Sequence, residues 1–219
     1  SLVRKELLFL QSDPSSPERG QYGFLQALVQ RVAYDTLSRH DRKAKHLAAA
    51  RYLAEDAGID PDEIAEVIAA HFLDAARADV DAADHAEIRA SARTWLERAG
   101  ERATALAAAD EAQRSFVAAA ELADEPPVRA RLLERAGTIA RAATRLSEAA
   151  SLLAEARDLY AKIGDTHAAA RATAGMARVL HTGGQIEEAI RVGEEAYAVL
   201  AGDEPDEDTA MLAAELARL

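Results

Sequence analysis

The sequence contains no cysteine and little glycine, proline or aromatic side chain. Its 219 residues include 11 Gly, 6 Pro, 4 Phe, 5 Tyr and 1 Trp. The lack of cysteine excludes disulfide bonds, a thiol nucleophile and zinc-finger spacings, and it is typical of a cytosolic protein. No apolar run reaches the roughly 18 residues that a transmembrane helix needs, and no signal peptide is recognisable. We therefore expect a cytoplasmic protein without a membrane span.

Helix-forming residues dominate what is present. Alanine occupies 54 positions and leucine 24, whereas the runs of Val, Ile, Thr and aromatics that build large sheets are absent. The composition predicts an all-α fold. Acidic residues followed by Pro, Glu or Gln predict capped helix starts at Asp60, Asp84 and Asp110, and Ser147 predicts another.

Charge is distributed unevenly along the chain. Residues 1–55 contain 9 Lys/Arg and 6 Asp/Glu, whereas residues 56–219 contain 17 and 32. An acidic body repels phosphate backbones, so we do not expect general nucleic-acid binding there. A third hypothesis is DNA binding by residues 1–57, which would need an intact recognition helix.

The first 25 residues differ from the helical remainder. Residues 5–11 form a short apolar run suited to a strand, and residues 12–20 are rich in turn formers. Residues 21–24 then suit a returning strand. The pattern predicts a short N-terminal β-hairpin that leans on nearby helices.

Three segments of the chain repeat one another. Each copy has four anchor positions: a small residue, an alanine 12 positions later, a third residue four positions after that alanine, and a second alanine three positions further on. The third residue is large and apolar in the first two copies and is glycine in the last. The anchors are Gly100, Ala112, Phe116 and Ala119; Gly137, Ala149, Leu153 and Ala156; and Ala177, Ala189, Gly193 and Ala196.

This pattern resembles tetratricopeptide repeats (TPR), which are stacked helix pairs. The resemblance covers residues 90–202, with 206–219 as the opening helix of a further, truncated unit. It implies that small residues such as Gly100 and Ala112 let paired helices approach, while Phe116 or Leu153 fills the space between pairs. The repeat spacings of 37 and 40 residues exceed the usual period of about 34, so lengthened helices are expected. A generic α-solenoid is the alternative.

A second resemblance lies near the N-terminus, in residues 18–46 and 69–75. These residues resemble the segment that joins the ATPase module to the helical tail in bacterial STAND/AAA-type signalling ATPases, which often contain class III adenylate/guanylate cyclase domains. The resemblance implies three regions: 1–57 as the end of a winged-helix-like region, 58–89 as connecting helices, and 90–219 as TPR-like repeats. It also implies that this chain is a piece of a longer protein whose ATPase and cyclase motifs lie elsewhere.

Motifs for chemistry are missing from the sequence. It contains neither a P-loop nor a dinucleotide-binding glycine motif. The six histidines are dispersed, and His40 and His46 are six residues apart, which does not place them on one helix face as a zinc pair. We therefore expect no catalytic residue, no cofactor, no metal site and no enzyme activity from this chain.

The TPR resemblance also implies a concave groove lined by the first helix of each repeat. At the groove positions the second and third repeats place a basic stripe inside the acidic body. Arginine side chains suit carboxylates, so the expected partner is a protein or peptide with an acidic segment or a C-terminal carboxylate. In the alternative, these arginines pair with glutamates of neighbouring repeats. The candidate groove residues are Arg131, Thr138, Arg141, Arg171, Arg178 and His181.

The leading hypothesis is a non-catalytic protein-interaction scaffold, the sensing or docking part of a larger signalling ATPase or cyclase-type regulator. A second hypothesis is a structural module that packs on other domains of its parent protein or forms a homodimer, with no separate ligand. Exposure of the groove arginines distinguishes the two.

Overall fold

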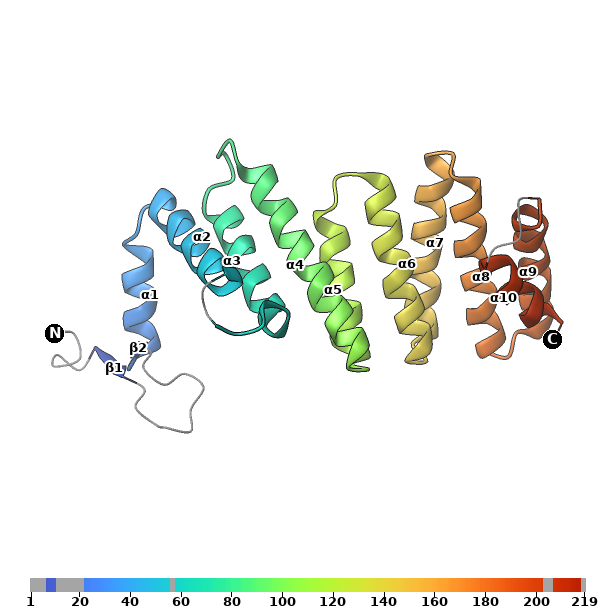
Figure 1. Cartoon of the computed structure of the whole chain (residues 1–219), viewed down its shortest axis with the longest axis horizontal. Helices are drawn as coiled ribbons and strands as arrows, with labels where there is room; N and C mark the ends of the chain where they lie inside the picture. The colour runs from blue at the N-terminus through green and yellow to red at the C-terminus, as the bar shows by residue number, and fades with distance from the viewer. Residues whose placement is uncertain (1–6, 11–21, 56–57, 203–206, 218–219) are drawn as a thin grey trace.

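The structure is a computed structural model that describes residues 7–10, 22–55, 58–202 and 207–217. Within these residues the chain forms a row of helices that runs from one end of an elongated molecule to the other (Figure 1). None of the described helices is both long and apolar enough to cross a membrane. The elements are β1 (Leu8–Leu10), β2 (Tyr22–Phe24), α1 (Ala27–Asp35), α2 (Arg39–Glu55), the 3-10 helix η1 (Pro61–Ile64), α3 (Ala65–Ala78), α4 (His85–Ala105), α5 (Ala109–Leu122), α6 (Pro126–Ala142), α7 (Leu146–Lys162), α8 (Thr166–Thr182), α9 (Ile186–Leu200) and α10 (Glu207–Leu216).

Each helix from α2 to α10 packs against the next one along the chain. Successive helices run antiparallel and form hairpins that stack side by side (Figure 1). Because a single hairpin cannot bury its own apolar stripe, stacking creates the continuous core of a solenoid. The predicted all-α, TPR-like solenoid is confirmed.

The two strands form the small β-hairpin that the N-terminal pattern predicts. Strands β1 and β2 pair antiparallel, with Leu8 opposite Phe24 and Phe9 opposite Gly23. The Phe9 ring lies over Gly23, where a Cβ would overlap the ring. The predicted turn segment, residues 12–20, lies outside the described residues.

Small residues at the repeat anchors allow paired helices to approach closely. A Cβ placed on Gly100 would lie 2.8 Å from the Phe116 ring, and one on Gly137 would lie 2.8 Å from Leu153 Cγ. Phe116 and Leu153 are both fully buried, as the repeat pattern predicts. Ala112 is likewise buried without exposed surface.

The third repeat has small residues at both facing positions, Ala177 of α8 and Gly193 of α9. Gly193 of α9 stands where the first two repeats have a large apolar residue. A Cβ at Gly193 would lie 2.8 Å from Leu216 Cδ2, because Leu216 of α10 reaches over this glycine. The following helix therefore supplies the volume that α9 lacks.

Helices begin at or next to Asp84, Asp110 and Ser147, but none of the three side chains makes the predicted capping hydrogen bond. Asp84 precedes α4 but makes no capping hydrogen bond, because its carboxylate binds Lys43 of α2. Asp110 lies inside the first turn of α5 and binds Arg145 rather than a backbone amide. Ser147 is the second residue of α7, which starts at Leu146. In the first two cases an interhelical ion pair takes the side chain that local sequence assigns to a cap.

Asp60 does accept a hydrogen bond from the backbone N–H of Asp62, as predicted. The turn that follows is the 3-10 helix η1, and the α-helix begins only at Ala65.

The turn inside each repeat has a left-handed residue at the same position. Ala107, Thr144 and Gly184 have φ values of 58°, 59° and 78°. Glycine adopts this conformation freely, but Ala and especially β-branched Thr do so at a cost. The hairpin geometry therefore requires a left-handed residue at this position, even in the first two turns, where the residue is Ala or Thr.

Candidate interaction groove

An open groove of about 310 Å³ lies where the first helices of the three repeats, α4, α6 and α8, run beside one another. Residues of α6 and α8 contact each other, so the first helices of neighbouring repeats lie close together on this side of the solenoid. Three arginines and one glutamate provide the charged groups of the groove. It is lined by Thr104, Phe116, Arg131, Glu134, Arg135, Thr138, Ile139 and Arg171.

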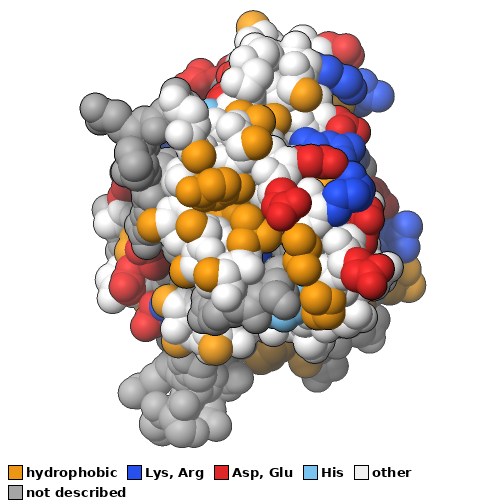
Figure 2. Space-filling model, turned by 90° about the vertical axis from the view of Figure 1, so that its right-hand side faces the viewer, with side chains coloured by type: hydrophobic (Ala, Val, Ile, Leu, Met, Phe, Trp, Pro, Cys, Tyr) orange, Lys and Arg blue, Asp and Glu red, His pale blue; other side chains and the backbone are white. Residues whose placement is uncertain are grey.

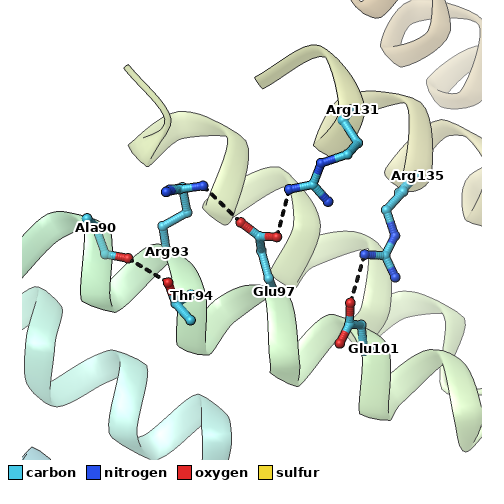
Figure 3. A network of polar contacts seen from close by, with 7 residues as sticks. All are labelled: Ala90, Arg93, Thr94, Glu97, Glu101, Arg131 and Arg135. Carbon is cyan, nitrogen blue, oxygen red and sulfur yellow. Dashed lines mark hydrogen bonds and ion pairs between the residues drawn. The ribbon is translucent and has the colours of Figure 1, made fainter. Parts of the chain in front are cut away.

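Arginines of α6 reach back to glutamates of α4 (Figure 3). Arg131 Nη2 donates to Glu97 Oε2 at 2.9 Å, and Arg135 Nη1 donates to Glu101 Oε1 at 3.0 Å. Arg93 of α4 donates to the other oxygen of Glu97 at 3.1 Å. Arg131 and Arg135 are thus each oriented by a carboxylate on the preceding repeat.

The next step along the solenoid repeats this arrangement between α8 and α6. Arg171 donates through Nε and Nη2 to both oxygens of Glu134, at 2.8 and 2.9 Å. The Tyr160 hydroxyl donates to the same carboxylate at 3.0 Å. Burial, together with the neighbouring Glu134 carboxylate, raises the pKa of Tyr160 to about 12. Both oxygens of the largely buried Glu134 carboxylate therefore accept hydrogen bonds from side chains of this chain.

Arg131 and Arg135 retain hydrogen-bonding capacity toward the groove. Their side chains are 45% and 35% exposed, and each spends only one guanidinium nitrogen on its glutamate. The other N–H groups of these two arginines donate to no acceptor within the described part of the chain. The Arg135 guanidinium also lies over the Phe116 ring, 4.2 Å from its centroid, which fixes its plane.

Three of the six predicted groove residues come together in the structure. Arg131, Thr138 and Arg171 all line the groove. The Thr138 hydroxyl donates to the Glu134 backbone carbonyl at 3.0 Å. Arg131 and Arg171 both make the interrepeat ion pairs that the alternative hypothesis envisaged.

The other three predicted residues lie outside the groove lining. Arg141 and His181 belong to the last turns of α6 and α8, and Arg178 lies one turn before His181. Arg141 and Arg178 are half-buried and His181 is exposed. The predicted basic stripe is therefore split between the groove and the ends of its helices.

Arg135 is a groove residue that the sequence analysis did not select. A signal was present, because Glu97 and Arg131 are 34 residues apart, as are Glu101 and Arg135. In both pairs the arginine follows the glutamate by slightly less than the 37-residue repeat spacing, and such a separation predicts an ion pair between adjacent first helices. The TPR position pattern alone does not include this site.

No cluster of three or more metal-binding side chains occurs among the residues with described positions.

No protein-family model matches the sequence, and no curated protein matches it. A search of solved structures finds a crystal structure of a Podosopora anserina putative kinesin light chain with nearly identical TPR-like repeats. That structure has a TM-score of 0.49 and 16% identity, over 82% of this chain and 85% of the other.

Proposed function

We propose that this chain is a non-catalytic protein-interaction scaffold whose groove binds an acidic peptide segment or a C-terminal carboxylate of a partner. The observation that supports the proposal is the pair Arg131 and Arg135. Each guanidinium group is held in place by a glutamate of α4, and its remaining N–H groups can donate to a ligand. The groove thus offers fixed cationic donors beside the half-buried Ile139, while the Phe116 ring under Arg135 is fully buried.

Orientation by Glu97 and Glu101 favours binding in two ways. An arginine already restrained in one rotamer loses less conformational entropy when a ligand binds. Its remaining donors can still form charge-assisted hydrogen bonds, each contributing about 1.5–3 kcal/mol. The glutamates also balance the local charge, so selectivity depends on hydrogen-bond geometry more than on net charge.

We further propose that the scaffold is the sensing or docking part of a larger signalling ATPase or cyclase-type regulator. Support comes from the resemblance of residues 18–46 and 69–75 to the corresponding segment of such ATPases. Partner binding in the groove would then bias the activity of modules elsewhere in that protein.

A structural or oligomerisation module is the second candidate function. It is favoured by the apolar surface of α1 and of Leu25 just before it, because Leu25, Leu28 and Val32 are 52%, 71% and 56% exposed. Such a face suits packing against another domain or another copy.

Fluorescence polarisation tests the groove directly. The probe is a short fluorescein-labelled peptide of alternating Glu and Gly with a free C-terminal carboxylate, and its comparators are the amidated and the Lys-for-Glu versions. Arg131→Gln and Arg135→Gln should each weaken binding of the acidic probe about tenfold or more, since each removes charge-assisted hydrogen bonds. The Lys peptide should bind to none of the proteins.

Arg191→Gln is the matched control, because Arg191 is exposed on α9, pairs within its own helix and lies outside the groove. It removes the same charge and should leave the affinity within about twofold. Equal loss in all three variants would show that only net charge matters and would refute a specific groove. No binding by the wild type, together with a concentration-dependent dimer in sedimentation, would favour the structural module.

A further inference from the structure

Three side chains from three consecutive helices form a hydrogen-bonded row near the N-terminal end of the solenoid. The Tyr34 hydroxyl of α1 lies 2.9 Å from His46 Nε2 of α2. His46 Nδ1 lies 3.1 Å from His71 Nδ1 of α3. The rings also contact one another, with centroid separations of 5.7 Å for Tyr34–His46 and 5.4 Å for His46–His71.

The facing Nδ1 atoms of His46 and His71 can share only one proton. A hydrogen bond between them requires one nitrogen to donate and the other to accept. The row therefore tolerates two neutral imidazoles, or one neutral and one protonated imidazole. When both rings are protonated, two N–H groups and two positive charges face each other at 3.1 Å, and the hydrogen bond is lost.

Helix α1 depends strongly on this row because it has little other attachment. None of its residues is buried. Its C-terminal end is held by Arg42 of α2, which donates to the backbone carbonyls of Asp35 and Leu37. Within the described residues, Tyr34–His46 is the hydrogen bond between two side chains that joins α1 to α2. Losing it leaves α1 attached through residues 36–38 and through Arg42 at its C-terminal end, so that its N-terminal part can move away from α2.

We propose that Tyr34, His46 and His71 form a proton-sensitive latch that holds α1 against the helical repeats and releases it when both histidines become protonated. The β-hairpin would move with α1, because β2 leads directly into it. The repeats from α4 onward would stay in place, since the latch involves only α1, α2 and α3.

The surrounding charges modulate this latch without replacing it. Burial lowers the pKa of His46 below its usual range; Asp74 raises it, and the neighbouring His71 lowers it. Asp74 is shared with Arg77 at 3.2 Å. Among the other charged groups of α2 and η1, Arg42 lies over the Tyr34 ring, Lys43 pairs with Asp84, and Asp62 pairs with Arg98.

The direction of the pH effect follows from the lowered pKa of His46. The latched state favours neutral His46, whereas a released His46 titrates near its ordinary value of about 6.5. Latching is therefore complete above about pH 6.5 and weakens as the pH falls below it. The ratio of released to latched chains should rise by at most about tenfold per pH unit for each proton bound.

Paired spin labels on the full chain test the latch. Because the chain contains no cysteine, Gln30→Cys on α1 and Glu66→Cys on α3 provide unique labelling sites. Distances measured by pulsed electron resonance should be narrow at about pH 8 and become longer and broader toward about pH 5.5, where histidines protonate. Far-UV circular dichroism at each pH confirms that the repeats remain folded.

His46→Gln keeps a hydrogen-bonding side chain but removes titration, so its distances should not depend on pH. His40→Gln is the matched control, because His40 is an exposed histidine of the same helix outside the row; it should behave as the wild type. Unchanged distances in the wild type, or the same transition in His46→Gln, would overturn the proposal. Imidazole proton NMR of the unmodified chain is an independent check, in which ordinary titration of His46 would also overturn it.

Discussion

The close approach of α4 and α5 at Gly100 gives the sharpest test of how the repeats pack. In Gly100→Ala, the new Cβ would lie 2.8, 2.9 and 3.0 Å from three carbons of the Phe116 ring. These distances are shorter than van der Waals contact, so the ring or a helix must move. The ring is fully buried and is covered by the Arg135 guanidinium, which leaves it no free space.

Two opposing effects determine how much Gly100→Ala changes the free energy of unfolding. Replacing glycine by alanine inside a helix favours folding by about 1 kcal/mol. Overpacking a dense core costs about 1–3 kcal/mol. We therefore expect the free energy of unfolding to fall by as much as about 2 kcal/mol. Urea denaturation followed by circular dichroism measures this change.

A double-mutant cycle separates the clash from other effects. Phe116→Leu removes the ring carbons that the new Cβ would meet, so Gly100→Ala should cost less in that background, with a coupling of about 1 kcal/mol or more. Gly183→Ala is the control, because its Cβ would have ordinary contacts at 3.4 Å or more. If Gly100→Ala were more stable than the wild type by the full helix-propensity gain of about 1 kcal/mol, or if Phe116→Leu gave no relief, the close-packing explanation would be refuted.

The remaining predictions concern turns, titration and the last helix. Thr144→Gly should raise the free energy of unfolding by about 0.5–1 kcal/mol by relieving a left-handed threonine, whereas Gly184→Ala should lower it; urea denaturation measures both. Because the folded state raises the pKa of Tyr160 to about 12, the neutral phenol contributes stability below about pH 10, where a free tyrosine ionises. That contribution should be lost as the pH rises toward about 12; stability measured against alkaline pH should show it in the wild type and not in Tyr160→Phe. Leu216→Ala should weaken α10 by about 2 kcal/mol, seen as faster hydrogen exchange in α10 than in the wild type.

Each of these predictions can fail in a specific way. Destabilisation by Thr144→Gly would show that the threonine makes compensating contacts in the turn. Identical alkaline profiles for the wild type and Tyr160→Phe would show that Tyr160 ionises normally. Unchanged exchange in Leu216→Ala would show that α10 does not depend on the contact with Gly193.

Local sequence determined the helices, their pairing and the small-to-large contacts between them. The periodic alanines and leucines encode amphipathic helices, and short breaks between such helices favour antiparallel hairpins. The repeated spacing from Gly100 to Phe116 and from Gly137 to Leu153 encodes which side chains fill the space between pairs. These features depend on neighbours within one or two helices, so a single sequence suffices to predict them.

The groove was predicted only in part, because its composition depends on register between repeats. The TPR pattern placed Arg131, Thr138 and Arg171 together, but it omitted Arg135. It also assigned Arg141 to a groove that does not extend to the end of α6. Small differences in helix length and tilt accumulate across stacked hairpins, and they decide which side of a helix faces its neighbour.

Only the tertiary structure decided the contacts between residues that are far apart in sequence. Asp84 has the sequence of a helix cap, yet Lys43 takes its carboxylate because packing brings α2 beside the start of α4. His46 and His71 are dispersed in sequence, yet they meet between α2 and α3. Backbone propensity acts over a few residues, whereas an ion pair or a shared proton requires two surfaces to meet. The sequence by itself therefore determined which helices form and how each pairs with the next, and the stacking of those pairs decided which polar groups meet.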